Sequence, residues 1–104
     1  MLEPVPMPVP AAVGKVSIIS HEMVREAGIP QVQATIKNVG SGTIGLVEAT
    51  VDFLDGTGHL IDTSIDSVTN LEPNRTWDFV VICSEEGCKN VTRYKIQAKG
   101  STTG

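Results

Sequence analysis

The sequence predicts an all-β protein in which two antiparallel sheets pack face to face. Three observations carry this prediction. Apolar and polar residues alternate with a period of two in several segments, turn-forming residues separate those segments, and no long segment has the 3.6-residue period of a helix. A strand with one apolar face must bury that face, and two facing sheets achieve this.

The alternation defines the expected strands. It is clean in residues 31–37, 47–53, 77–83 and 94–98, and less regular in residues 15–24 and 60–68. Six or seven short strands in about 100 residues are typical of an immunoglobulin-like or fibronectin-III-like sandwich, so we expect about seven strands. A closed barrel is the alternative. The aromatic residues all fall on these segments, and we expect them in the core: Phe53, Trp77, Phe79 and Tyr94.

Turn chemistry lies between the strands. Asp55 and Gly56 form an Asp-Gly pair, a strong hairpin signal. Residues 38–42 and 70–74 are rich in Asn, Gly and Pro, which favour turns. Four prolines alternate with apolar residues near the N-terminus, so residues 1–12 are predicted to be an extended Pro-rich linker. We expect the sandwich domain over residues 13–99 and a disordered tail over 100–104.

Composition excludes several classes of protein. The 8 Lys and Arg against 12 Asp and Glu give a formal net charge of −4, which argues against a nucleic-acid partner. Mean hydropathy is +0.07 and no long apolar run occurs, so no membrane insertion is expected within this segment. We expect a monomer.

Two cysteines bracket a four-residue loop. Cys83 shares its strand parity with Trp77, and Cys88 shares its parity with Tyr94. If these two strands form a regular hairpin, both sulfurs lie on one face at its end and a disulfide is possible. Two free buried thiols are the alternative. A bridge would pin the register of that hairpin and favour an oxidising compartment, so we expect an extracytoplasmic or cell-surface location, with the cytoplasm as the alternative.

Two N-x-[ST] triplets begin at Asn74 and Asn90 and are possible glycosylation sites. Asn90 has the inward parity of Tyr94, which counts against its modification unless the predicted hairpin contains a bulge.

Patterns that resemble catalytic or metal motifs fail on their context. Residues 40–45 read Gly-Ser-Gly-Thr-Ile-Gly, but a strand pattern follows where dinucleotide binding needs a helix. His21-Glu22 begins a zinc-protease motif that Arg25 breaks, because the second histidine is missing. No catalytic residue, cofactor or metal ligand is therefore assigned.

Acidic residues flank the Asp-Gly hairpin, and we expect three of them to share its outward face: Asp52, Asp62 and Asp66. A solvated face is the simpler interpretation, with calcium binding as the alternative.

The central part of the chain resembles an FxLYD-type domain, and more loosely a CARDB-like module. Three stretches carry the resemblance: residues 36–40 (Ile-Lys-Asn-Val-Gly), the hairpin at 51–60, and 71–79 with its Leu-Glu-Pro-Asn turn. The naming motif retains Asp55, with Val51, Phe53 and Leu54 in place of Phe, Leu and Tyr. The resemblance implies an immunoglobulin-like sandwich, often found in exported or membrane-tethered prokaryotic proteins, and it supplies no catalytic residues.

These observations predict a non-catalytic extracytoplasmic module that binds another protein, or spaces neighbouring domains of its own chain. An accessory domain of an exported enzyme and a metal-binding module are the alternatives.

Overall fold

The computed structural model describes residues 15–101, and within them six strands and one short helix follow one another. Their bounds are β1 Val16–Glu26, β2 Ile29–Asn38, β3 Ile44–Asp55, β4 Leu60–Leu71, β5 Thr76–Ile82, the 3₁₀ helix η1 Glu86–Asn90, and β6 Val91–Ser101. All six alternating segments form strands, and the described residues contain six strands where about seven were expected. The predicted linker over residues 1–12 and positions 102–104 of the predicted tail lie outside the described residues.

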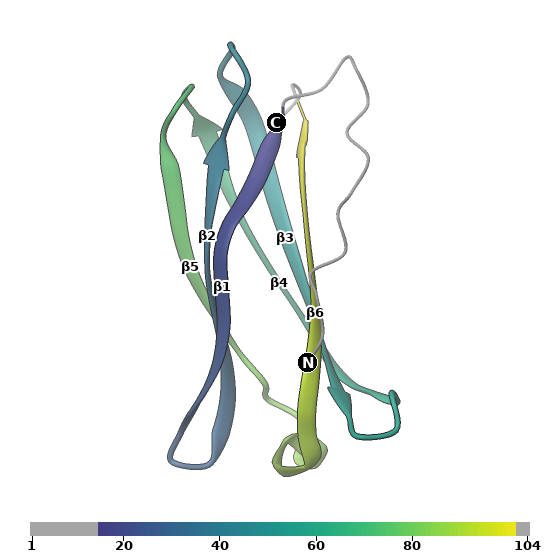
Figure 1. Ribbon diagram of the computed structural model, residues 1–104. Coiled ribbons are helices and arrows are strands. Elements are labelled where there is room, and N and C mark those ends of the chain that lie inside the picture. The colour runs from purple at the N-terminus through teal and green to yellow at the C-terminus, as the bar shows by residue number, and fades with distance from the viewer. Residues whose placement is uncertain (1–14, 102–104) are drawn as a thin grey trace.

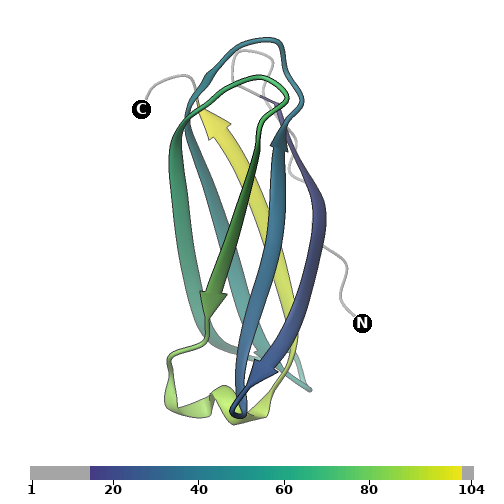
Figure 2. The same ribbon diagram turned by 90° about the vertical axis from the view of Figure 1, so that its left-hand side faces the viewer.

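The strands form an all-β sandwich of two three-stranded antiparallel sheets, ordered β1-β2-β5 and β4-β3-β6. The two sheets lie face to face (Figure 1), and Figure 2 looks onto β1-β2-β5 with the other sheet behind it. At one flank of the sandwich β1 lies beside β6, and at the other β4 lies beside β5. The predicted fold class is confirmed.

The two ends of the sandwich differ in their connections. At the crossover end, residues 39–43 and 72–75 carry the chain from one sheet to the other. At the hairpin end, residues 27–28 and 56–59 close hairpins, and residues 83–90 form the third crossing between the sheets. β1 begins and β6 ends at the crossover end (Figure 1).

Alternate residues of the inner strands fill the core. On β3, Val47, Ala49, Val51 and Phe53 are fully buried, and their polar neighbours face outward. Burying an aliphatic or aromatic side chain of this size contributes about 1.5–3 kcal/mol, so this one strand is a large part of the stability. Phe79 and Tyr94 are also buried, as expected.

Trp77 differs from the expectation because it is only half-buried. It packs on the border of the core and stacks on Phe79, with ring centroids 4.8 Å apart. Trp77 lies near the start of β5, an edge strand, so one side of its ring remains open to solvent.

The first hairpin contains two features that alternation alone does not show. Ala27 and Gly28 both have positive φ (53° and 83°), the geometry of a two-residue turn whose twist matches the strands. In β1 the pairing shifts between Ile18 and Ser20, which leaves Ile19 as an extra residue. This bulge reverses the parity of β1, so Ile18 and His21 both face inward.

The last two strands do not form the expected hairpin. β5 pairs with β2, and β6 pairs with β3 in the opposite sheet. Strand parity predicts which face a side chain occupies but not which strand lies alongside, and η1 supplies the crossing. β6 also continues through Gly100 and Ser101, beyond the predicted boundary at residue 99.

Candidate functional site

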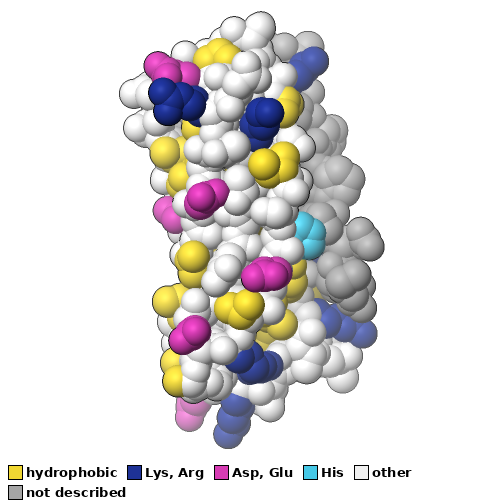
Figure 3. All heavy atoms as spheres, turned by 60° about the vertical axis from the view of Figure 1, so that its left-hand side comes forward, with side chains coloured by type: hydrophobic (Ala, Val, Ile, Leu, Met, Phe, Trp, Pro, Cys, Tyr) yellow, Lys and Arg dark blue, Asp and Glu magenta, His cyan; other side chains and the backbone are white. Residues whose placement is uncertain are grey.

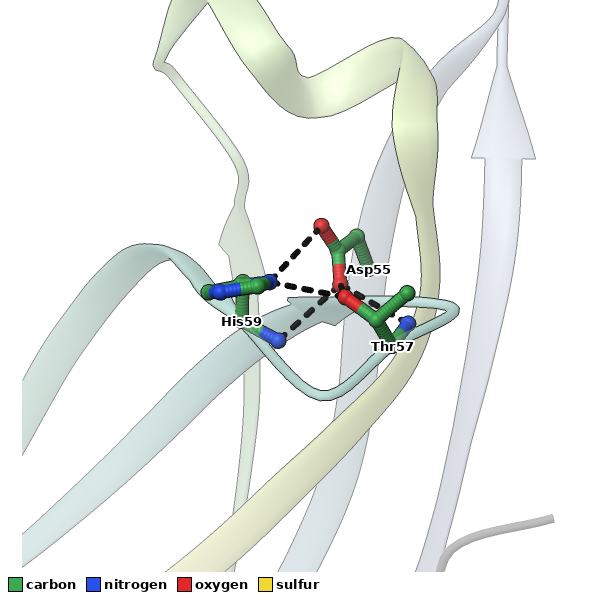
Figure 4. A network of polar contacts seen from close by, with 3 residues as sticks. All are labelled: Asp55, Thr57 and His59. Carbon is green, nitrogen blue, oxygen red and sulfur yellow. Dashed lines mark hydrogen bonds and ion pairs between the residues drawn. The ribbon is translucent and has the colours of Figure 1, made fainter.

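The tip of the β3–β4 hairpin holds the densest polar cluster (Figure 4). Asp55 Oδ1 accepts hydrogen bonds from the Thr57 amide at 2.9 Å, the Thr57 hydroxyl at 2.8 Å and the His59 amide at 2.9 Å. These donors, the Thr57 hydroxyl first, hold the pKa of Asp55 below its ordinary value because they stabilise the carboxylate. The cluster caps a tight turn.

The same three residue types occur in catalytic triads, but their arrangement here differs. A triad histidine faces its acid with one ring nitrogen and its nucleophile with the other. His59 uses Nδ1 for both, at 2.7 Å from Thr57 Oγ1 and 3.8 Å from Asp55 Oδ2. Its side chain is 81% exposed, so nothing excludes water. No proton path from hydroxyl through imidazole to carboxylate results from this geometry.

The two cysteines meet where the chain crosses between the sheets. Cys83 follows β5 and Cys88 lies in η1, with their Cα atoms 5.9 Å apart and their sulfurs at disulfide distance. Both are buried, and the Cys83 amide donates to Pro30 O of β2 at 3.0 Å. The disulfide closes a loop within this crossing, and the Cys83 amide ties the loop to β2. The expected role in pinning a hairpin register is wrong because β5 and β6 do not pair.

Asp62 lies beside the cysteines and bridges the β4–β5 flank. Its Oδ2 accepts hydrogen bonds from the Ser84 amide at 2.9 Å and the Ser84 hydroxyl at 3.3 Å. One ligand atom from each of Asp62, Cys83 and Cys88 lies within 4.8 Å of the others. Metals bind the thiolate form of cysteine, so sulfurs joined to each other are poor ligands. With the disulfide formed, these three residues therefore stabilise the structure and do not form a metal site.

The acidic residues of the second hairpin do not share one face, contrary to the expectation. Asp52 pairs with Thr63 on the outer face, while Asp62 pairs with Phe53 and Asp66 pairs with Ala49 on the core side. β4 is an edge strand, so its inward carboxylates reach solvent and the neighbouring flank. Charges placed this way discourage another chain from pairing with the edge.

The β1–β6 flank is closed by two contacts near the hairpin end. His21 Nδ1 hydrogen-bonds the Tyr94 hydroxyl, and the Arg25 guanidinium donates to Val91 O. Burial raises the pKa of Tyr94 because it disfavours the phenolate, and the nearby Glu22 charge adds to this shift.

Asn38 is the buried polar residue of the described chain, and sequence reasoning assigned it only to a turn. Its Nδ2 donates to Leu71 O at 2.8 Å and Gly42 O at 2.9 Å, and its Oδ1 accepts from the Gly40 amide at 2.9 Å. Its backbone carbonyl accepts from Asn74 N at 2.9 Å. The side chain thus joins the first crossing to the end of β4, and the backbone carbonyl holds the second crossing; the Asn-x-Gly spacing was the only sequence signal.

Both possible glycosylation sites are exposed. Asn74 occupies a left-handed backbone position in its turn, with φ of 67°. Asn90 ends η1, which breaks the strand parity, so the inward position expected for it is wrong. The glycine-rich segment over residues 40–45 runs directly into β3, and no helix begins there.

The outer face of β1-β2-β5 carries the apolar patch, defined as Val24, Ile29, Val80 and Ile82. Val24 and Ile82 flank Gln31 on either side, and Ile29 precedes Gln31 by two positions on the same face. Ile29, Val80 and Ile82 are 45–50% exposed. Figure 3 looks toward this side and shows hydrophobic side chains at the surface among charged ones.

A shallow groove of about 450 Å³ lies next to the patch on the same face. Thr35 Oγ1 donates to Asp78 Oδ1 at 2.7 Å across the groove floor. The groove is lined mainly by polar residues of the three strands: Ser20, Glu22, Gln33, Thr35 and Asp78, with Val80 at its border.

Comparison with known proteins gives the fold and one relative. No protein-family model matches the chain. It is 34% identical over 84 residues to the uncharacterized protein MJ0360 of Methanocaldococcus jannaschii, an alignment that covers 78% of this chain and 62% of that protein. The chain thus spans less than two thirds of this relative's length.

Two solved structures have a similar fold. A DUF1425 family member from Shewanella sp. PV-4 superposes with a TM-score of 0.68 at 11% identity, covering 93% of this chain and 97% of the other. Campylobacter jejuni cj0090 superposes with a TM-score of 0.58 at 11% identity, covering 89% and 91%. These matches define the class as a small all-β sandwich. In residues 15–101 no helix has the length and apolar character to cross a bilayer.

Proposed function

We propose that the chain is a non-catalytic protein-interaction module that works outside the cytoplasm. The apolar patch carries the proposal. Surface side chains as large as Ile29, Val80 and Ile82, half exposed on one face, are typical of a surface that another protein covers. On the described strands of the other sheet, two large apolar side chains are comparably exposed: Ile65 at 64% on the outer face and Leu60 at 60% at the start of β4.

The polar residues that could act in catalysis support this proposal because they make structural hydrogen bonds. Asp55, Thr57 and His59 cap a turn, Asp62 bridges one flank and His21 bridges the other. The resemblance to the FxLYD type supports the same conclusion, since that family is associated with exported or membrane-tethered proteins.

Location outside the cytoplasm is supported by the cysteine pair, since disulfides persist in oxidising compartments. We expect thiol trapping of the protein in its own host to find Cys83 and Cys88 bonded in an extracytoplasmic fraction. Free thiols in a cytoplasmic fraction would contradict this part of the proposal.

The interaction is tested by photo-crosslinking from the two sheet faces. A photoreactive residue at Gln33, beside the patch, should capture a discrete protein in the host cell. The matched control is Ser67, which is also exposed but lies on the outer face of the other sheet. Equal capture from both positions, or none from Gln33, would contradict the proposal.

A further inference from the structure

The four edge strands of the sandwich are protected to different degrees. Long, regular edges pair readily with other chains, so proteins interrupt, shorten or charge them. β1 has its bulge at Ile19, β5 has only 7 residues, and β4 turns Asp62 and Asp66 inward. β6 has 11 residues and pairs with β3 without a register shift from Arg93 to Ser101. Within residues 15–101, β6 carries exposed lysines, but from Arg93 onward it is neither short nor interrupted, and no charged side chain of it turns inward.

Half of this edge, called the open half below, has no neighbouring strand among residues 15–101. Near the hairpin end, Tyr94 and Val91 are tied to β1 through His21 and Arg25. From Lys95 to Gly100, β3 is the only strand of the described chain that pairs with β6. No other strand in residues 15–101 pairs with the backbone groups of this half that point away from β3.

The side chains along the open half have a clear pattern. Lys95 and Lys99 are exposed on the outer face, and Ile96 and Ala98 are buried on the inner face. A strand beside β6 would place alternate side chains next to each set. Acidic residues fit the outer positions and aliphatic residues fit the inner ones.

β3 already shows this complementarity on the other side of β6. Lys99 Nζ lies 3.9 Å from Glu48 Oε1, and Asp52 is the register partner of Lys95. Between these pairs, Val51 faces Ile96 on the core side. Because the side chains of a strand project from the face of the sheet, they can contact side chains of the neighbouring strand on either side.

The inner face beyond the open edge is also apolar. Val16 and Ile18 of β1 lie at the same end of the molecule and are only partly buried against the core. Aliphatic side chains of an added strand would lie over them and remove this surface from water.

We propose that the open half of β6, from Lys95 to Gly100, binds an extended protein segment with alternating aliphatic and acidic side chains. The segment adds a fourth strand to β4-β3-β6 through main-chain hydrogen bonds, and its acidic side chains contact Lys95 and Lys99. This inference rests on the proposed interaction function and assigns it a second surface, distinct from the apolar patch.

The test uses the full chain and a peptide with the sequence of residues 47–53, Val-Glu-Ala-Thr-Val-Asp-Phe. Binding is followed by amide NMR shifts, which we expect to concentrate on β6. Replacing both acidic residues of the peptide by lysine should weaken binding about tenfold or more. The variant Lys95→Glu/Lys99→Glu should reverse this preference and bind the lysine peptide more tightly.

A matched control is Arg75→Glu/Lys89→Glu, which makes the same change in net charge at exposed positions outside β6. It should leave peptide affinity within about twofold of the original chain. Methylating alternate peptide amides separates main-chain pairing from charge attraction, since one set should abolish binding and the other should not.

Three results would overturn the proposal. They are no β6 shifts at about 1 mM peptide, equal effects of the two methylation sets, or slow amide exchange along the outer side of β6 in the free protein. The last would show that the edge is already covered, by the chain's own first fourteen residues or by a second copy. None of these results bears on crosslinking from Gln33, so failure of this inference is distinguishable from failure of the proposed function.

Discussion

The two ends of the sandwich hold their connections between the sheets by different chemistry. At the crossover end, the fully buried side-chain amide of Asn38 hydrogen-bonds the crossing at residues 39–43 and the end of β4. At the hairpin end, the bond between Cys83 and Cys88 of η1 closes a loop within the third crossing. A neutral amide is insensitive to redox conditions and pH, whereas a disulfide is not. The stability of the crossover end is thus independent of the redox conditions of the compartment, and the stability of the hairpin end depends on them.

Replacing Asn38 by Ala should have the largest effect. It removes the buried partner of the Leu71 carbonyl and the partly buried partners of the Gly42 carbonyl and the Gly40 amide, and we expect the free energy of unfolding to fall by about 2–4 kcal/mol. Denaturant unfolding measures this loss. Asn90→Ala, at an exposed position, is the control and should change stability by less than about 0.5 kcal/mol. A loss as small as that for Asn38 would show that water replaces its hydrogen bonds.

Opening the disulfide should have the next largest effect. The sequence separation is only 5, so chain entropy predicts a loss of about 2 kcal/mol for Cys83→Ala/Cys88→Ala. Reductant should lower the melting temperature of the original chain and leave that of the variant unchanged. If reductant shifted both equally, the cysteines would not be its target.

Combining both changes tests whether the ends act independently. β2 has 10 residues, so the two ends lie about 30 Å apart. We expect the losses from Asn38→Ala and Cys83→Ala/Cys88→Ala to add within about 0.5 kcal/mol. A larger deviation would show that the sheets transmit strain along their length. Asn38→Ala alone and Cys83→Ala/Cys88→Ala alone are the controls.

Tyr94 makes the hairpin end sensitive to alkaline pH. Its pKa is raised in the folded state, so its contribution to stability is complete below the ordinary value of about 10 and is lost as pH rises through the folded-state value. The chain has 1 tyrosine, so ultraviolet absorbance reports its ionisation directly. Tyr94→Phe should flatten the alkaline decline. The same decline in both proteins would assign it to other groups.

The hairpin tip should respond least. The pKa of Asp55 is lowered, so its contribution is present above the ordinary carboxyl value and lost as pH falls through the folded-state value. Thr57→Val removes the strongest donor and should move the pKa of Asp55, measured by NMR, toward its ordinary value. We expect the melting temperature to change by less than about 2 °C, since the tip is exposed. No movement of the pKa would contradict the assigned cause.

Much of this fold follows from alternation in the sequence. The features that alternation did not predict have physical reasons. Parity located all six strands, because a half-buried strand must alternate. Parity did not predict that β5 and β6 lie in different sheets, since it carries no information about partners. Ile19 also escaped it, because a bulge inserts a residue without a distinct composition. Asn38 was assigned to a turn, because its burial depends on Leu71, which is distant in sequence.

The positions of Lys15 and Ser101 have a consequence for any longer polypeptide that contains this unit. Both lie at the crossover end, so chain entering before Lys15 and leaving after Ser101 would attach at the same end of the sandwich. Such a unit would project sideways from its neighbours and add little to the distance between them. The geometry therefore suits a laterally attached domain, which presents its hairpin end and its sheet faces to other molecules, better than it suits a rigid spacer.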